Sequence, residues 1–139
     1  DMSEIPPLLH SGHKFDVGLR LKSYGPNETS DEMAKANSRF GIDIDTIWKA
    51  ADYVASAPNL NLVMFHAMVG SQILDREAFV DWLRPAIEIY ARLRQRHPHL
   101  RIFNFGGGMP VAMTLDFDFD YHAFARLLLT TATMCRCRT

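Results

Sequence analysis

The sequence of 139 residues has little cysteine, no excess of either charge and no long apolar run. Its cysteines, Cys135 and Cys137, lie one residue apart, whereas a disulfide framework needs spaced pairs. The formal net charge is -1, so no basic face for a nucleic acid is indicated. The longest apolar runs, such as 62–65, are far too short to cross a bilayer, and the first residues do not resemble a signal peptide. We therefore expect a cytoplasmic protein with neither a nucleic-acid nor a membrane partner.

The overall composition is that of a folded globular chain. Hydrophobic residues make up 47% and charged residues 22%, a balance typical of a soluble domain and not of a disordered segment. The length suits one hydrophobic core, so we expect a single domain over residues 1–139. Residues 130–139 are expected to form an irregular tail. Cys135 and Cys137 lack a second ligand pair, so they are interpreted as two thiols in this tail, and no metal is expected.

Stretches of strand character alternate with stretches of helical character. Apolar runs of strand length lie at 15–21, 61–67 and 100–105. Apolar stripes with three- and four-residue spacing predict helices at 46–56, 76–97 and about 121–129. Asp45 and Asp75 are the expected N-caps of the first two helices. Strands joined by helices make right-handed parallel crossovers, which predicts an α/β fold, and three strands can form only part of an eight-stranded barrel.

Two loops that directly follow predicted strands have a composition suited to an anion. Gly70 lets the backbone approach a ligand closely, and Ser71 adds a hydroxyl donor. Gly106, Gly107 and Gly108 expose backbone N–H groups with no side chains in the way, which suits a phosphate. Each motif alone is more typical of a plain turn. Because the carboxyl ends of parallel strands meet at one edge of a sheet, the two together predict a phosphate site there.

Three motifs occur in order along the chain: Ser-Arg-Phe-Gly-Ile at 38–42, Phe-His-Ala-Met-Val-Gly-Ser-Gln at 65–72, and Asn-Phe-Gly-Gly-Gly at 104–108. In order and spacing they resemble the fold type III decarboxylases that depend on pyridoxal 5′-phosphate (PLP). That family contains the ornithine, diaminopimelate, arginine and carboxynorspermidine decarboxylases. The resemblance spans about residues 15–129 and implies an incomplete (β/α)8 TIM barrel of the alanine racemase-like type.

The resemblance implies cofactor-binding roles for several positions. Ser71 would donate a hydrogen bond to the phosphate of PLP. The backbone amides of Gly106, Gly107 and Gly108 would surround the same phosphate. Arg20, at the end of its strand, matches a family arginine near the cofactor. A simple surface or interface salt bridge is the alternative interpretation of Arg20.

The chain departs from the family pattern beside the cofactor. Many members have His-x-His before the Gly-Ser-Gln sequence, and the second histidine stacks on the pyridine ring. Here His66 is present but Met68 occupies the second position. The thioether of Met68 can lie against a ring, yet it can neither donate a hydrogen bond nor carry charge. His66 is interpreted either as a cofactor contact or as a satisfied core histidine.

The lysine that anchors PLP as a Schiff base in this family lies well upstream of the Ser-Arg-Phe-Gly motif. The chain has four lysines: Lys14, Lys22, Lys35 and Lys49. Lys35 superficially imitates the family motif, but it lacks the preceding strand that would bury the amine and lower its pKa. No residue of the chain is therefore expected to be catalytic. Arg39 would lie near the dimer interface, because the family builds its active sites from two subunits, and a homodimer is implied.

The implied function is PLP-dependent decarboxylation of a basic or diamino acid: diaminopimelate, arginine, ornithine or a polyamine precursor. The chain alone is expected to be inactive. Two alternatives stay open. One is a non-catalytic homologue that acts by protein binding, and the other is an amino-acid racemase with the same type of barrel.

Overall fold

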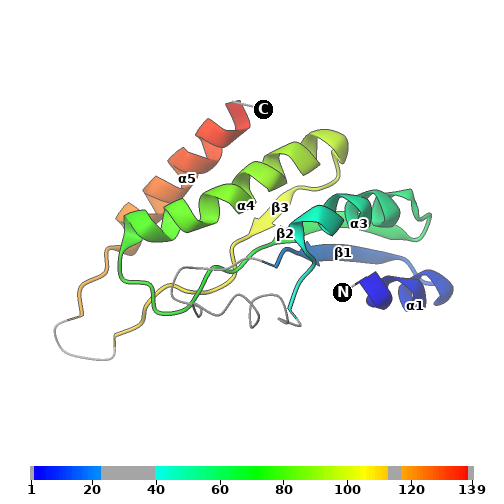
Figure 1. Cartoon of the computed structure of the whole chain (residues 1–139), viewed down its shortest axis with the longest axis horizontal. Helices are drawn as coiled ribbons and strands as arrows, with labels where there is room; N and C mark the ends of the chain where they lie inside the picture. The colour runs from blue at the N-terminus through cyan, green and yellow to red at the C-terminus, as the bar shows by residue number, and fades with distance from the viewer. Residues whose placement is uncertain (1, 23–39, 113–116, 138–139) are drawn as a thin grey trace.

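The computed structural model describes residues 2–22, 40–112 and 117–137. Residues 136 and 137 are described by their backbone only. Its elements are, in chain order, η1 (Met2–Glu4), α1 (Ile5–His10), β1 (Phe15–Arg20), α3 (Ile44–Ser56), β2 (Leu60–His66), α4 (Arg76–Arg96), β3 (Ile102–Asn104) and α5 (Tyr121–Cys137). Figure 1 shows the strands in the middle of the molecule, with α4 and α5 side by side along one flank. Among these helices none is long and apolar enough to cross a membrane.

The strands form one parallel sheet in the order β1-β2-β3. Each strand is joined to the next through a helix, α3 and then α4, which confirms the predicted α/β class and its parallel crossovers. The register shifts once, between Val17 and Gly18 in β1. Beyond this irregularity Arg20 is paired with His66, and His66 is paired with Asn104 in β3.

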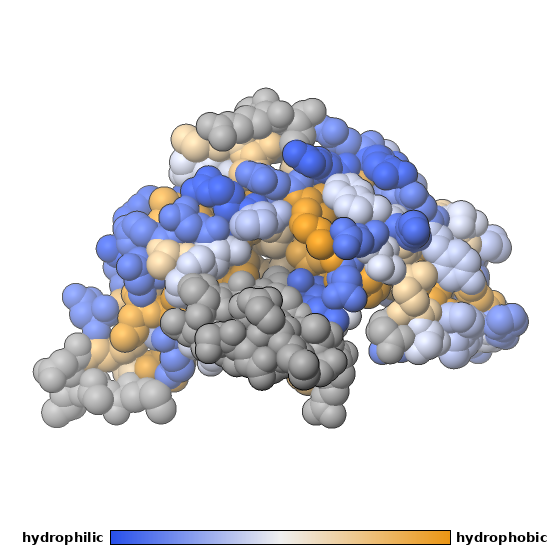
Figure 2. All heavy atoms as spheres, in the orientation of Figure 1, coloured by the Kyte–Doolittle hydropathy of each residue, from blue (hydrophilic) through white to orange (hydrophobic). Residues whose placement is uncertain are grey.

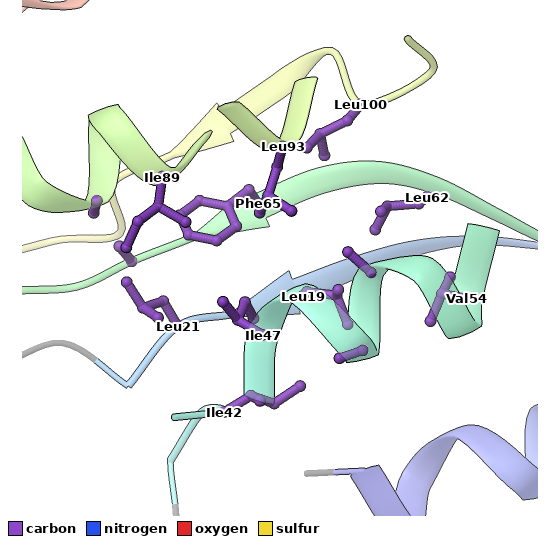
Figure 3. Close-up of a cluster of buried hydrophobic side chains, with 14 of the residues drawn as sticks. Leu19, Leu21, Ile42, Ile47, Val54, Leu62, Phe65, Ile89, Leu93 and Leu100 are labelled. Carbon is purple, nitrogen blue, oxygen red and sulfur yellow. The ribbon is translucent and has the colours of Figure 1, made fainter. Parts of the chain in front are cut away.

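The main core lies between the sheet and the helices α3 and α4. Leu19 and Phe65 point from β1 and β2 toward these helices, where they meet Ile47 of α3 and Leu93 of α4 (Figure 3). Ile47 is fully buried and Phe65 is nearly so, as expected for strands with an apolar face packed on amphipathic helices. The face of the molecule seen in Figure 2 carries mainly hydrophilic residues, with hydrophobic ones visible near its centre.

Two of the helices begin at aspartates whose carboxylates cap them. Asp75 Oδ1 accepts from the N–H of Ala78 at 2.9 Å, which confirms the predicted N-cap of α4. Asp120 Oδ1 accepts from the N–H of Ala123 at 2.8 Å at the start of α5. The predicted cap of α3 was wrong by two residues, because the helix begins after Asp43 and takes Asp45 into its first turn. A carboxylate in a first turn still interacts favourably with the helix dipole.

The expected irregular tail is also wrong for residues 130–137, because α5 continues to Cys137. Thr131 and Cys135 are buried, and with Phe124 they recur at helical spacing on the face of α5 that packs against α4. Phe124 lies 4.9 Å from Phe79 between ring centroids. Threonine and cysteine are poor helix formers, so packing against α4 overrides their local preference.

The N-terminal segment forms helical structure that the sequence patterns did not predict. The helix α1 has prolines in its first turn, where a missing N–H costs nothing. Ile5 is buried, and the Nδ2 of Asn59 donates to the carbonyls of Leu8 and His13, each at 3.0 Å. These bonds tie the segment to the start of β2.

Candidate functional site

Polar side chains form a row across the sheet on the face opposite α3 and α4. Because Arg20, His66 and Asn104 are register partners on neighbouring strands, their side chains lie next to one another where the strands end. The guanidinium of Arg20 also lies over the ring of Phe40, 5.1 Å from its centroid. The row stands at the carboxyl ends of parallel strands, which is where such sheets bind ligands.

His66 is half-buried in the middle of this row. Burial lowers the pKa of His66 below its ordinary value, and the positive charge of Arg20 lowers it further. The lowered pKa favours the neutral form of the imidazole. A side-chain carbon placed on Gly106 would lie 3.0 Å from Nε2 of His66. His66 thus adjoins the glycine loop on the open face of the sheet, away from the apolar core beneath the helices.

The loops that follow β2 and β3 meet, as the sequence predicted. The N–H of Ile73 donates to the carbonyl of Gly108 at 2.9 Å. A side-chain carbon on Gly108 would lie 2.7 Å from the carbonyl oxygen of Gly70. Such a separation is shorter than any real contact, so the two backbones approach this closely only because Gly108 has no side chain.

The three consecutive glycines are not equivalent. Gly106 and Gly108 have φ of +74° and +100°, a region that favours glycine. The N–H of Gly106 donates to Oδ1 of Asn104 at 2.8 Å. This amide is therefore already bound within the chain, and the cofactor contact predicted for Gly106 stays a prediction. Open space surrounds the position that a side chain on Gly107 would take.

Three donors around this loop have no partner among the described residues: the N–H groups of Gly107 and Gly108 and the hydroxyl of Ser71. Ser71 is exposed and directly follows Gly70, which lies against Gly108. A phosphate accepts several hydrogen bonds, and consecutive backbone amides are a common way to supply them. The residues present therefore fit the phosphate end of PLP.

Met68 lies next to Gly106, as His66 does. A side-chain carbon on Gly106 would lie 3.0 Å from Cβ of Met68 and 3.2 Å from its Cγ. The structure thus brings His66, Met68 and Gly106 together, with Arg20 on the far side of His66. All seven predicted cofactor-binding positions lie around the ends of the strands and the loops that follow them.

Two residues without a predicted role shape this region. Asn104 holds the first amide of the glycine loop, and its Nδ2 lies 3.8 Å from Sδ of Met64 on the neighbouring strand. Gln72 has a positive φ of +53°, and its Oε1 accepts from the N–H of Val111 at 2.9 Å. Both stand inside the motifs singled out in the sequence, yet neither spacing nor composition shows which backbone group a side-chain amide will bind.

The lysines that the structure describes offer no obvious replacement for the missing anchor. Lys22, just beyond β1, forms an ion pair with Asp43 at 3.0 Å. Lys14 lies before β1, and Lys49 lies on α3. Lys35 and Arg39 fall outside the described residues.

Comparison with known proteins agrees with the fold. Among solved structures, diaminopimelate decarboxylase from M. jannaschi superposes with a TM-score of 0.77 at 20% identity, over 94% of this chain and 32% of that one. The Helicobacter pylori enzyme in complex with L-lysine superposes with a TM-score of 0.75 at 22% identity, over 95% and 34%. The α/β structure with its parallel strands is therefore part of a TIM barrel, as predicted.

Sequence comparison gives relatives of the same kind. The chain is 31% identical to a diaminopimelate decarboxylase of Aquifex aeolicus over 109 residues, which are 77% of the chain and 26% of the relative. It is 32% identical to a biosynthetic arginine decarboxylase of Prochlorococcus marinus over 113 residues, 76% of the chain and 17% of the relative. The chain thus spans about a quarter or less of these relatives. Residues 1–134 match the family described as pyridoxal-dependent decarboxylase, pyridoxal binding domain. The chain belongs to this family of pyridoxal-binding decarboxylase domains.

Proposed function

We propose that the chain supplies the phosphate-binding part of a PLP-dependent decarboxylase. The observation that carries this proposal is the meeting of two loops at the ends of β2 and β3, with the donors of Ser71, Gly107 and Gly108 left without a partner among the described residues. Membership of the pyridoxal-binding family supports the same ligand. When bound, PLP supplies the electron sink that stabilises the negative charge left by the loss of CO₂.

The residues around the loop have distinct roles in this proposal. The hydroxyl of Ser71 and the amides of Gly107 and Gly108 bind the phosphate dianion. Gly106 shapes the loop, because its own amide is bound to Asn104. Fixed donors of this kind need no reorganisation when the ligand arrives, which favours tight binding.

His66, Met68 and Arg20 form the wall next to the phosphate loop. Partial burial, and then the charge of Arg20, favour the neutral form of His66, in which the imidazole can accept or donate a hydrogen bond without adding charge. Met68 offers a polarisable apolar surface suited to contact with an aromatic ring. Arg20 itself contributes a fixed positive charge close to the anionic ligand.

We further propose that the substrate is a basic or diamino acid and that the working enzyme is a homodimer. The relatives are named for diaminopimelate and arginine. The chain alone is expected to be inactive, because it lacks the family's lysine motif in its usual place. The test is CO₂ release from diaminopimelate, arginine and ornithine, with PLP, by the native gene product and by the chain alone. Release by the former alone supports the proposal, and no release from any of the three contradicts it.

A non-catalytic homologue that acts by protein binding is the second candidate. It is favoured by one observation, the presence of Met68 where the family's stacking histidine is expected. This candidate predicts a stable complex with a decarboxylase subunit and no turnover. Product analysis separates it from the proposed function and from a racemase, since CO₂ indicates decarboxylation and an enantiomer indicates racemisation.

A further inference from the structure

Gln72 has a backbone conformation that its side chain does not favour. Its φ of +53° is the one positive φ outside glycine in the described part of the chain. A non-glycine residue in this left-handed region carries a conformational cost, so it persists where neighbouring interactions hold it in place. Gln72 directly follows Ser71, so its backbone conformation helps to set where the serine hydroxyl lies.

The side chain of Gln72 provides such an interaction. Its Oε1 accepts from the N–H of Val111 at 2.9 Å, across to the loop that carries the glycines. The next residue, Ile73, donates its N–H to the carbonyl of Gly108 at 2.9 Å. Two hydrogen bonds from consecutive residues therefore join the serine loop to the glycine loop, on either side of Met109 and Pro110.

The glycine loop is held at its other end too. The N–H of Gly106 is bound to Asn104, and Val111 is bound to Gln72. Pro110 has no N–H, and its carbonyl accepts from the hydroxyl of Tyr121 at 2.6 Å. The fixed points bracket Gly107 and Gly108, whose amides stay available for a ligand.

We propose that Gln72 is a positioning residue for phosphate binding: its carboxamide fastens the two loops so that the donors of Ser71, Gly107 and Gly108 converge on one anion. This inference rests on the proposed function, since it concerns the same phosphate site. Gln72 does not itself bind the ligand in this account. It acts through Val111 and through its own left-handed backbone, which orient the groups that do.

The test separates the side-chain bond from the backbone conformation. Gln72→Gly and Gln72→Asn both suit a positive φ, but neither side chain can reach Val111. Binding of PLP and of pyridoxal, which lacks the phosphate, is measured by equilibrium dialysis for each variant. The ratio of the two affinities reports the contribution of the phosphate alone. Gln95→Asn, on the exposed C-terminal part of α4, is the matched control.

We expect both Gln72 variants to lower the preference for PLP over pyridoxal by about five- to tenfold, the effect of one lost hydrogen bond, while Gln95→Asn leaves it unchanged. Ser71→Ala combined with Gln72→Asn should cost less than the sum of the two single changes, because both act on one site. Hydrogen exchange at the Val111 amide should become faster in both Gln72 variants. This second readout tests the bond even if a variant is less stable.

Two unfavourable results have different meanings. If the unmodified chain does not prefer PLP to pyridoxal, the proposed phosphate site itself is wrong. If it prefers PLP and both Gln72 variants keep the full preference, the site stands and the positioning role of Gln72 is overturned. Unchanged exchange at Val111 would likewise overturn that role.

Discussion

His66 is partly buried beside the guanidinium of Arg20, which makes its protonation costly. Burial first, and the charge of Arg20 second, lower the pKa of His66 in the folded chain below 6.5. Between that lowered pKa and 6.5, the unfolded chain binds more protons than the folded one, so the free energy of unfolding falls as the pH falls through this window. Above the window the imidazole is neutral in both states, and the effect vanishes.

The first prediction concerns this pH dependence. His66→Gln should reduce the loss of stability between pH 7.5 and pH 5.5, measured as the shift in the urea midpoint. His122→Gln, on an exposed part of α5, is the matched control and should leave the loss as it is. In a chain that keeps His66, the single change Arg20→Gln should raise the pKa of His66 seen by NMR titration. Equal pH dependence in the His66 and His122 variants would contradict the account.

At the scale of one element, the glycine loop depends on two of its three glycines for its shape. Gly108→Ala should lower the free energy of unfolding by on the order of 2 kcal/mol, because a side chain there is strained and meets the carbonyl of Gly70. Gly107→Ala should change it by less than about 0.5 kcal/mol, since nothing surrounds that position. Urea denaturation of both variants is the measurement. Equal stabilities would show that the two loops do not approach as described.

The elements that the sequence predicted well are those with a long periodic pattern. The stripe of α4 and its cap Asp75 were predicted from the chain alone, because apolar spacing and a cap are both local signals. The end of α5 was missed, since Cys135 and Thr131 become helical through packing against α4. In the site, the joining of the two loops could be predicted from parallel topology. The capture of the Gly106 amide could not, because a side-chain bond of this kind leaves no periodic trace.

At the scale of the whole molecule, the sheet is covered by helices on one face. The strand β3 lies at one edge of the sheet, and its Ile102 is 43% exposed. Edge strands with exposed apolar side chains invite pairing with another chain. Ile102 and Asn104 alternate along β3, so the exposed isoleucine lies on the same face of the sheet as the polar row of the site. The donors of the phosphate loop lie at the edge of this face.

We predict that the chain self-associates through this face. Ile102→Asn should raise the concentration at which association is half complete by about tenfold, the effect of losing one buried isoleucine contact. Ile44→Asn, which changes an exposed isoleucine at the start of α3, should leave it unchanged. Sedimentation velocity over a range of concentrations is the measurement. A monomer at all concentrations, or equal effects of both changes, would contradict the prediction.

The most direct test of the central claim is a titration of the chain with PLP, followed by borohydride reduction and mass spectrometry. We predict saturable binding that leaves no lysine adduct and that Ser71→Ala weakens by about tenfold, because one hydrogen bond to a charged phosphate is lost. Absence of saturable binding, or binding that Ser71→Ala leaves unchanged, would contradict a phosphate site at these loops. A labelled lysine would contradict the claim that the chain lacks the anchoring residue.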